Sequence, residues 1–318
     1  MSNTLDPRLN AFNDDLADKS LKDKIERKRY EEGQIYQVTA PVTTLRGQFD
    51  FKAPKGKQES EVLFGENVKV FNIKDNIAFV QSHNDQYVGY VSRLDLSPYI
   101  KNNTHWVSVR NAQVYSEATM KSQIIMNLPM TARVFVTGEA QNGYLPISWN
   151  GNHHGFISEK HLKTLGTHES DIVKTAEALL GTPYVWGGKS AFGIDCSGLL
   201  QTAFTAAGRP CLRDTDMQEN DPSLGQKLAI KDDIAPQNLK RGDIIFFKGH
   251  VGIMTDDKNL IHANAYFMRV TIDPLKDVAT RIKKTEGVGI TSVVRYASET
   301  TTAEPKGFLK FLKKAFRR

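Results

Sequence analysis

Cysteine is scarce in this chain of 318 residues, which contains only Cys196 and Cys211. Two cysteines cannot build a disulfide framework, so a small disulfide-stapled fold is excluded and a reducing compartment is allowed. No cysteine and histidine show the spacing of metal ligands, so no metal site is expected. The role of the two cysteines must therefore be sought in packing or in thiol chemistry.

Long apolar segments are also missing. No run approaches the roughly 20 apolar residues of a membrane span, and residues 1–19 are polar and acidic, without the apolar core of a signal peptide. The composition, with 40% hydrophobic and 25% charged residues, is that of an ordinary globular protein. We therefore expect a cytoplasmic protein, built from two or three domains because 318 residues exceed one small core.

The formal net charge of +6 comes from one end of the chain. Residues 305–318 hold six basic residues and no acidic one, so the remainder is balanced. A nucleic-acid binder usually spreads basic residues over a folded face, so no nucleic-acid partner is expected. Apolar positions in the tail, residues 299–318, follow helical spacing. Two interpretations stay open: a basic amphipathic helix in weak contact with an anionic inner membrane surface, or a solvated tail.

The first half of the chain changes pattern once. Residues 1–34 read as a helical or extended lead-in, in which Phe12 and Leu16 are spaced as on a helix. Helical periodicity is then absent as far as Leu165, and short alternating runs are separated by Gly, Asn and Asp. This pattern is typical of small all-β domains with tight turns.

A short repeat divides this β-rich stretch. The run Gly89-Tyr-Val-Ser92 reaches Leu96, and Gly155-Phe-Ile-Ser158 reaches Leu162 with identical spacing. The spacing predicts two tandem modules of about 60 residues, and the Gly-aromatic-aliphatic ends resemble those of bacterial SH3-like domains. The predicted modules are residues 35–98 and 104–165.

Helical periodicity returns in residues 168–298. A short amphipathic helix is predicted over residues 171–180, and a second helix begins at Cys196, where Asp195 is a suitable cap. The strand-like runs that follow are residues 243–247, 251–254 and 259–262. A helix followed by antiparallel strands predicts an α+β domain.

Cys196 stands where a thiol is useful as a nucleophile. Free amides and the positive end of the helix dipole lower the pKa of a thiol at a helix N-terminus. Two histidines follow on adjacent predicted strands, His250 and His262. Because side chains alternate along strands, the two share a face only if the connecting hairpin loop has an odd length, such as the three residues 256–258.

If the histidines meet, the roles follow from chemistry. Cys196 attacks a carbonyl, His250 accepts its proton and later protonates the leaving amine, and His262 orients the His250 ring. The alternative is that each histidine is an ordinary hydrogen-bonded strand residue. The Gly-rich surroundings of Cys196 and the adjacency of both histidines favour the catalytic interpretation.

The motifs carry a resemblance to a known family. The run Gly181-Thr-Pro-Tyr-Val-Trp-Gly-Gly precedes Asp195-Cys-Ser-Gly-Leu, and Arg241-Gly-Asp-Ile-Ile precedes Gly249-His-Val-Gly-Ile. Over residues 170–296 this pattern closely resembles the NlpC family of papain-like cell-wall peptidases. With SH3-like modules in front, it resembles the dipeptidyl-peptidase VI subgroup, which cleaves the γ-D-glutamyl–diamino acid bond of murein peptides with a free N-terminal L-Ala.

The resemblance assigns roles residue by residue. It implies that Cys196, His250 and His262 form the catalytic triad, and that the first SH3-like module reads the free amine of the peptide through Glu66 and Tyr87. Glu61 competes with Glu66 for that role. The resemblance further implies a substrate pocket shaped by Tyr184, Trp186, Asp195, Ser197 and Thr215.

The expected protein is thus an α+β cysteine peptidase with a helix bearing the cysteine packed on an antiparallel sheet, behind two small all-β barrels. Its expected partner is a murein peptide, and neither a metal nor an organic cofactor is expected. Two alternatives stay open: a murein-binding protein that uses its SH3-like modules, and a thiol acyltransferase or amidase. The sequence determines neither the diamino acid at the leaving position nor the oligomeric state.

Overall fold

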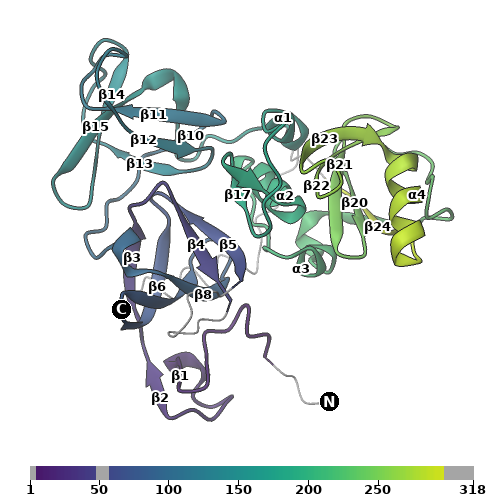
Figure 1. The fold of residues 1–318 in the computed structure, drawn as a ribbon, viewed down its shortest axis with the longest axis horizontal. Coiled ribbons are helices and arrows are strands. Elements are labelled where there is room, and N and C mark those ends of the chain that lie inside the picture. The colour runs from purple at the N-terminus through teal and green to yellow at the C-terminus, as the bar shows by residue number, and fades with distance from the viewer. Residues whose placement is uncertain (1–4, 48–56, 297–318) are drawn as a thin grey trace.

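The computed structural model describes residues 5–47 and 57–296, so the predicted tail at 299–318 lies outside the described residues. Figure 1 shows two sheet-built parts on one side and a mixed helix–sheet part on the other. Within the described ranges, no helix is long and apolar enough to cross a membrane.

The first sheet contains seven strands in the order β5-β4-β8-β7-β6-β3-β9, and its pairings are antiparallel. Its strands are β3 (Gln34–Val38), β4 (Val42–Arg46), β5 (Gln58–Leu63), β6 (Asn67–Lys74), β7 (Ile77–Ser82), β8 (Val88–Ser92) and β9 (Leu96–Ser97). A hairpin joins β6 to β7, and its turn residues Asp75 and Asn76 both have positive φ. Two such residues give a turn whose twist matches the strands it connects.

The second sheet repeats the first, with the order β12-β11-β15-β14-β13-β10-β16. Its strands are β10 (His105–Val107), β11 (Asn111–Tyr115), β12 (Ile124–Pro129), β13 (Arg133–Val136), β14 (Tyr144–Trp149), β15 (His153–Ser158) and β16 (Leu162–Thr164). A Cβ added at Gly89 would lie 2.6 Å from the Arg46 carbonyl oxygen, and one at Gly155 would lie 3.1 Å from that of Tyr115. The repeated glycine therefore lets a neighbouring strand approach closely at the same place in both modules.

The lead-in is extended, not helical, from Asp6 to Glu31. It forms the short parallel pair β1 (Leu16–Asp18) and β2 (Arg29–Glu31), with a single 3-10 turn at Lys19–Leu21. Asn13 Oδ1 accepts hydrogen bonds from the N–H groups of Asp15 and Leu16. These bonds give the backbone an alternative to helical hydrogen bonds. The helical spacing of Phe12 and Leu16 was therefore misleading.

The C-terminal part confirms the α+β prediction. Its central sheet has the order β19-β24-β20-β21-β22-β23 and is antiparallel. The strands of the central sheet are β19 (Gln226–Leu228), β20 (Asp243–Phe247), β21 (His250–Met254), β22 (Asn259–Asn264), β23 (Arg269–Pro274) and β24 (Ile290–Arg295). A separate two-stranded sheet consists of β17 (Lys189–Ser190) and β18 (Gly193–Ile194). The helices are α1 (Ile172–Glu177), α2 (Cys196–Ala206), α3 (Thr215–Glu219) and α4 (Leu275–Glu286).

Both faces of this sheet are covered, which explains the uninterrupted apolar run of β20. Ile244 and Phe246 join the core formed with α1 and α2, whereas Ile245 and Phe247 join the core formed with α4. Alternate side chains of a strand point to opposite faces, so a strand with two covered faces needs no polar positions. Figure 1 shows α2 and α4 on opposite sides of the strands.

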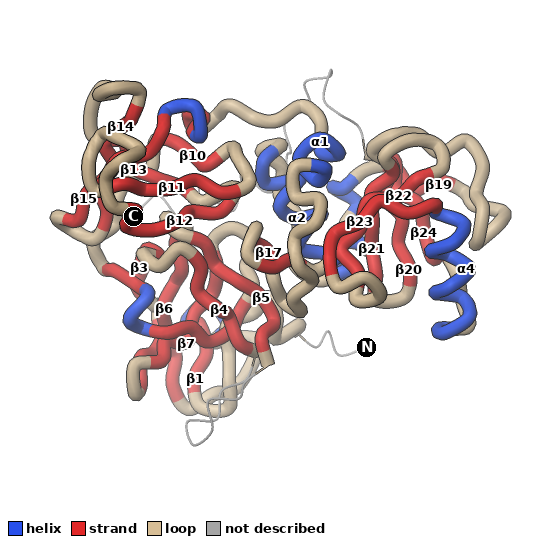
Figure 2. Tube along the Cα trace, turned by 45° about the horizontal axis from the view of Figure 1, so that its top comes forward, coloured by secondary structure: helices blue, strands red, loops and turns tan. Residues whose placement is uncertain are grey.

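The first module and the C-terminal part meet along the edge formed by β17. In both Figure 1 and Figure 2, β17 and α2 lie between the strand β5 and the central sheet. Met217 of α3 packs into the apolar core of the first module, beside Tyr87. The joint therefore has an apolar component that spans both parts.

Candidate functional site

Cys196 opens α2, as the sequence predicts. Asp195 is the N-cap, and its carboxylate accepts the N–H of Gly198 at 2.7 Å. The Cys196 side chain is nearly buried, with 8% of the residue exposed, and its Sγ lies 3.9 Å from Thr215 Oγ1. The N–H of Val251 points at the sulfur, so the thiol lies beside the start of β21, where His250 stands.

The two histidines share one face of the sheet, as the odd-length loop requires. Met254 pairs with Leu260, and Thr255 N–H bonds to the Asn259 carbonyl, so the loop is the three residues 256–258. His250 Nε2 lies 2.7 Å from His262 Nδ1. Because Nε2 is engaged with His262, Nδ1 is the ring nitrogen of His250 that remains for the thiol. The two histidines are thus placed as predicted, and the catalytic roles of Cys196, His250 and His262 stay a prediction.

The protonation state differs from the sequence-based expectation. Burial and the adjacent Asp195 carboxylate raise the pKa of the Cys196 thiol to about 11, although the nearby N–H groups of Val251 and Ser197 lower it. Desolvation, with His262 as a further cause, holds the pKa of His250 well below its usual range. The N–H of Ser197 at the helix N-terminus does lower the thiol pKa, but burial, followed by the Asp195 carboxylate, outweighs it. The resting pair is a neutral thiol and a neutral imidazole.

Asp273 is bonded to His262, and the sequence did not lead us to expect this contact. His262 Nε2 lies 3.0 Å from Asp273 Oδ2, and the His262 side chain is 1% exposed. His262 pairs with Thr271 across β22 and β23, so Asp273, two residues further along, lies on the same face. Strand alternation in residues 269–274 was the signal that would have indicated this carboxylate.

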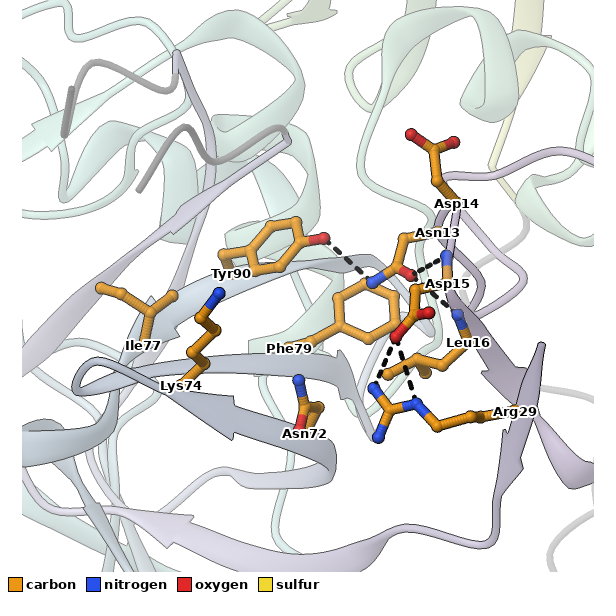
Figure 3. Close-up of a pocket in the computed structure, with 10 residues that line it drawn as sticks. All are labelled: Asn13, Asp14, Asp15, Leu16, Arg29, Asn72, Lys74, Ile77, Phe79 and Tyr90. Carbon is orange, nitrogen blue, oxygen red and sulfur yellow. Dashed lines mark hydrogen bonds and ion pairs between the residues drawn. The ribbon is translucent and has the colours of Figure 1, made fainter. Parts of the chain in front are cut away.

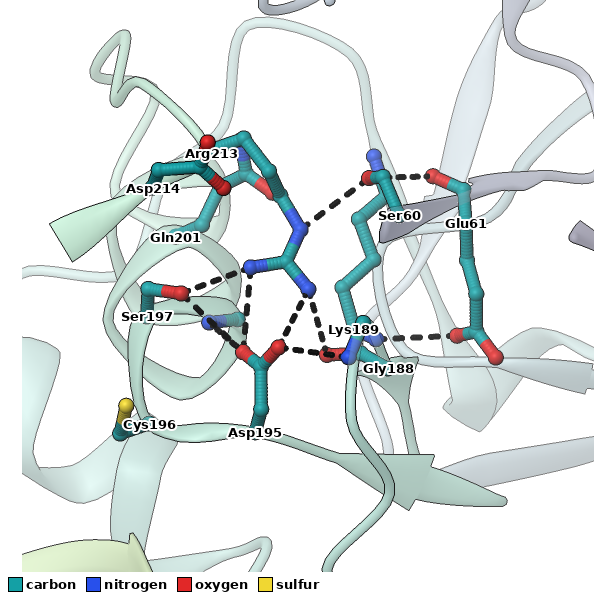
Figure 4. Close-up of polar contacts among 12 residues, drawn as sticks. Ser60, Glu61, Gly188, Lys189, Asp195, Cys196, Ser197, Gln201, Arg213 and Asp214 are labelled. Atoms are coloured by element: carbon teal, nitrogen blue, oxygen red, sulfur yellow. Dashed lines mark hydrogen bonds and ion pairs between the residues drawn. The ribbon is translucent and has the colours of Figure 1, made fainter. Parts of the chain in front are cut away.

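Asp195 and Ser197 form a buried ion-pair network instead of lining an open pocket (Figure 4). Arg213, 1% exposed, donates to both oxygens of Asp195 at 2.7 and 3.0 Å and to Ser197 Oγ at 2.7 Å. Asp195 also accepts the N–H of Gly187 at 2.8 Å, and Ser197 Oγ donates to Asp195 at 3.1 Å. Both side chains are engaged in this network and hold the loop that leads to Cys196, and their role in substrate binding stays a prediction.

Glu66 and Glu61 belong to the joint between the two parts. Glu66 is 2% exposed, accepts the Asn84 amide at 2.6 Å and the Leu63 N–H at 3.0 Å, and pairs with Lys189 Nζ at 3.3 Å. Glu61 accepts the N–H of Lys189 at 2.9 Å, and burial raises its pKa. Glu66 is thus held in the joint, and its role as reader of the peptide amine stays a prediction. One Glu61 oxygen accepts the Lys189 N–H, and the Glu61 alternative likewise stays a prediction.

The carboxylate that faces Tyr87 is Asp214. Tyr87 Oη donates to Asp214 Oδ2 at 2.9 Å, and Arg8 Nη1 from the lead-in reaches the same oxygen at 2.8 Å. Among the described residues nothing donates to Asp214 Oδ1, and the Asp214 side chain is 24% exposed. Desolvation raises the pKa of Asp214. Asp214 immediately precedes Thr215, which contacts the nucleophile, and this adjacency was the signal that the sequence offered.

The remaining predicted pocket residues lie close to the thiol or at the rim. Tyr184 is half-buried, and its pKa is raised by burial and by the neighbouring Cys196. Trp186 is 55% exposed, and Lys57 Nζ stacks over its ring at 4.3 Å. Thr215 touches the sulfur, as described above. Of these three residues, Trp186 is the exposed one, whereas Tyr184 and Thr215 lie against the thiol.

A separate surface cavity of about 450 Å³ lies away from these groups (Figure 3). It is lined by Asn13, Asp14, Asp15, Leu16, Arg29, Asn72, Lys74, Ile77, Phe79 and Tyr90. It contains no thiol and no histidine, so it has no part in thiol chemistry. Within residues 5–47 and 57–296, no cluster of three His, Cys, Asp or Glu side chains is arranged to hold a metal ion.

Comparison with known proteins agrees with the geometry. The NlpC/P60 family matches residues 181–286, and the bacterial dipeptidyl-peptidase Sh3 domain matches residues 51–96. Dipeptidyl-peptidase 6 of Lysinibacillus sphaericus is 30% identical over 241 residues, covering 68% of this chain and 84% of that protein. The gamma-D-glutamyl-L-lysine dipeptidyl-peptidase of Bacillus subtilis (strain 168) is 28% identical over 230 residues, covering 64% of this chain and 72% of that protein.

A solved structure shares the fold. The crystal structure of an NlpC/P60 family protein from Bacillus cereus ATCC 10987 superposes with a TM-score of 0.67 at 21% sequence identity. The match covers 83% of this chain and 99% of that one. The arrangement of two β modules before a helix–sheet part is thus shared across nearly the whole of that protein.

Proposed function

Because the chain belongs to the NlpC/P60 family of cysteine peptidases, we propose that it hydrolyses the γ-D-glutamyl–diamino acid bond of murein peptides that carry a free N-terminal L-Ala. The peptide would be cleaved through an acyl-enzyme on Cys196, in the recycling or turnover of murein peptides. The names of the relatives, dipeptidyl-peptidase 6 and gamma-D-glutamyl-L-lysine dipeptidyl-peptidase, support this substrate class.

The observation that carries the proposal is the carboxylate next to the nucleophile. Asp214 is held by Tyr87 and Arg8 through one oxygen, and no residue in 5–47 or 57–296 donates to the other oxygen. The next residue, Thr215, lies against Cys196 Sγ. An ammonium group bound at Asp214 would therefore sit a short peptide length from the thiol, which suits an enzyme that removes two residues from a free amino end. A charge-assisted hydrogen bond at this place rejects acylated peptides, because they would leave the carboxylate unpaired.

The chemistry follows from the neutral pair. As Cys196 Sγ attacks the γ-carbonyl carbon, His250 Nδ1 takes the thiol proton, so charge develops only during the attack. The N–H of Cys196 begins α2 and has no intrahelical acceptor, which leaves it as a donor for the oxyanion. Collapse of the tetrahedral intermediate breaks the C–N bond, and the imidazolium gives its proton to the amine that leaves. Water, activated by the same imidazole, then hydrolyses the thioester and regenerates the thiol.

The test is to incubate the protein with L-Ala-γ-D-Glu-meso-diaminopimelate and with its N-acetylated form, and to identify the products by mass spectrometry. We expect L-Ala-γ-D-Glu and free diaminopimelate from the first peptide and no products from the second. A lysine-containing tripeptide tested in parallel identifies the diamino acid that is preferred.

Other outcomes separate the alternatives. Cleavage of both peptides would keep the peptidase and contradict amine recognition at Asp214. Binding of the peptide without cleavage would indicate a murein-binding protein. Transfer of the L-Ala-γ-D-Glu group to an added amine, in place of hydrolysis, would indicate an acyltransferase. The Cys196→Ala variant is the control for each of these reactions.

A further inference from the structure

The second nitrogen of the orienting histidine is not left to solvent. His262 Nε2 is bonded to Asp273 Oδ2 at 3.0 Å, and the same carboxylate oxygen accepts the hydroxyl of Thr271. Asn264 Nδ2 also lies 3.3 Å from His262 Nε2. A buried ring nitrogen thus has one acceptor and one donor beside it, and the direction of the hydrogen bonds decides which tautomer His262 adopts.

The direction of the hydrogen bond between His262 and Asp273 follows from a backbone N–H group whose role as a donor is fixed. The N–H of Phe267 donates to Asn264 Oδ1 at 2.8 Å, so the other end of the Asn264 amide is its NH₂ group. This NH₂ donates to Thr271 Oγ1 at 2.8 Å, and Thr271 has one hydroxyl proton, which it gives to Asp273 Oδ2. Asp273 Oδ2 is therefore an acceptor, and the bond from His262 must be donated by Nε2–H.

A neutral imidazole ring carries one proton, so fixing the proton of His262 also fixes the proton of His250. We call this series of hydrogen bonds, from Asp273 through His262 to His250, the relay. Burial lowers the pKa of His262 in spite of the neighbouring Asp273, so the ring is neutral at neutral pH. With its proton on Nε2, His262 has a bare Nδ1, which accepts the Nε2–H of His250 at 2.7 Å. His250 then has a bare Nδ1, and this is the nitrogen that must take the proton of Cys196.

We propose that Asp273 is a positioning residue for catalysis, because its carboxylate sets the tautomers of His262 and His250 in series and thereby keeps the base nitrogen of His250 free. This inference concerns the thiol chemistry of the family and not the identity of the peptide. It extends the predicted triad by a fourth group that touches neither substrate nor sulfur.

Two substitutions at this position separate tautomer control from simple packing. In Asp273→Ala the acceptor is gone, and the polar neighbour left at His262 Nε2 is the Asn264 NH₂ donor, which favours the opposite tautomer in both rings. We expect kcat to fall roughly 10²-fold with little change in KM, in line with the large losses that follow from a wrong histidine tautomer. In Asp273→Asn the amide oxygen still accepts from both donors, so we expect a loss of about 10-fold or less, from the missing charge alone.

Matched variants test whether a loss of kcat comes from structural damage to β23. Ile272→Ala removes a side chain from the same strand that is 41% exposed, on the opposite face, and is expected to leave kcat unchanged. In a His262→Ala background, Asp273→Ala should cause no further loss of kcat, because without the His262 ring Asp273 no longer acts on His250. Equal and additive losses in both backgrounds would contradict the proposal.

A spectroscopic readout makes the test independent of the substrate. In protein labelled with ¹⁵N-histidine, two-bond ¹H–¹⁵N correlations at neutral pH report which nitrogen of each ring is protonated. We expect Nε2–H at both His250 and His262 in the wild type and in Asp273→Asn, and Nδ1–H at both rings in Asp273→Ala. A protonated Nδ1 in the wild type, or an unchanged pattern in Asp273→Ala, would overturn the inference. If no murein peptide is cleaved, the proposed substrate fails while this measurement still decides the relay.

Discussion

The two SH3-like modules share a fold and a repeat, but of the two only the first has a described side chain bonded to Asp214, the neighbour of Thr215 and Cys196. In the first, Tyr87 precedes the repeated Gly89 by two residues, is 3% exposed and bonds to Asp214. In the second, the corresponding residue before Gly155 is His153, which is exposed and bonds only locally, to the carbonyl of Asn150. The same scaffold position thus carries a buried tyrosine bonded to the catalytic domain in one copy and an exposed side chain in the other.

Their contacts with the catalytic domain differ in the same way. The first module places two buried carboxylates, Glu61 and Glu66, against Lys189 in the loop that leads to Cys196. The second module is joined by Met130, which is buried in the apolar core of the catalytic domain, by a bond from Arg110 to the carbonyl of Leu180, and by the Trp106 indole, which donates to the carbonyl of Thr167. Function here depends on which side chains a module presents at the joint, and the shared fold alone does not predict it.

The largest expected effect is a loss of kcat on substitution of Cys196, which lies in the catalytic domain and in neither module. Cys196→Ala should lower kcat by roughly 10⁴-fold or more, because the nucleophile is lost. Cys211→Ala is the matched control, since Cys211 is equally buried at 6% exposure and takes no part in the relay. Steady-state hydrolysis of the free-amine tripeptide measures both. Residual activity in Cys196→Ala, or an equal loss in Cys211→Ala, would contradict the assignment of the nucleophile.

Next comes the joint of the first module. Glu66→Gln leaves Lys189 without its closest charged partner in a buried place, and we expect a loss of about 3 kcal/mol in the free energy of unfolding. The matched change near the second module is Glu169→Gln, which breaks the more exposed pair with Lys163 and should cost less than about 1 kcal/mol. Urea denaturation gives both values. Equal losses would show that the two modules are attached with similar strength.

Amine recognition by the first module gives a smaller effect. Tyr87→Phe removes the hydroxyl that holds Asp214, so kcat/KM for the free-amine peptide should fall by roughly 10-fold, through KM. His153→Ala, at the corresponding place in the second module, should leave kcat/KM unchanged. If His153→Ala matched Tyr87→Phe, the functional difference between the modules would not exist.

The smallest effect concerns the thiol itself. With its pKa raised to about 11, Cys196 is almost entirely protonated at pH 7, and the thiolate fraction grows with pH. The rate of alkylation by iodoacetamide should therefore rise about tenfold per pH unit between pH 7 and pH 10. Parallel measurement on Cys196→Ala subtracts the contribution of Cys211, whose pKa burial also raises. A plateau below pH 7 would show a preformed thiolate–imidazolium pair and contradict the neutral resting state.

Local patterns predicted the nucleophile and the histidine pair, because each is encoded within a few residues. The cap Asp195, the helix after Cys196 and the odd loop between β21 and β22 are short-range features that the chain cannot easily override. The repeated glycine likewise predicted the two modules, because Gly89 and Gly155 mark the same close approach of strands.

Long-range contacts account for what the sequence did not show. Tyr87 and Asp214 are 127 positions apart, and the joint that brings them together has no local signature. The resemblance assigned Glu66 to the peptide amine, but the sequence does not reveal that Lys189, 123 positions away, pairs with Glu66 in the joint. The resemblance also assigned Asp195 to the pocket, and the sequence does not reveal that Arg213 donates to both of its oxygens.

The most direct test of the account compares how strongly the enzyme prefers a free amine before and after Asp214 is neutralised. Values of kcat/KM for the free-amine and N-acetylated tripeptides give that preference in the wild type and in Asp214→Asn. We predict a preference of roughly 10²-fold or more in the wild type, as expected when a site built for a charged partner meets an analogue that lacks it. In Asp214→Asn the kcat/KM values of the two peptides should become nearly equal, because the value for the free-amine peptide falls. An undiminished preference in Asp214→Asn would contradict the claim that the first module and Asp214 together read the amino end of the peptide.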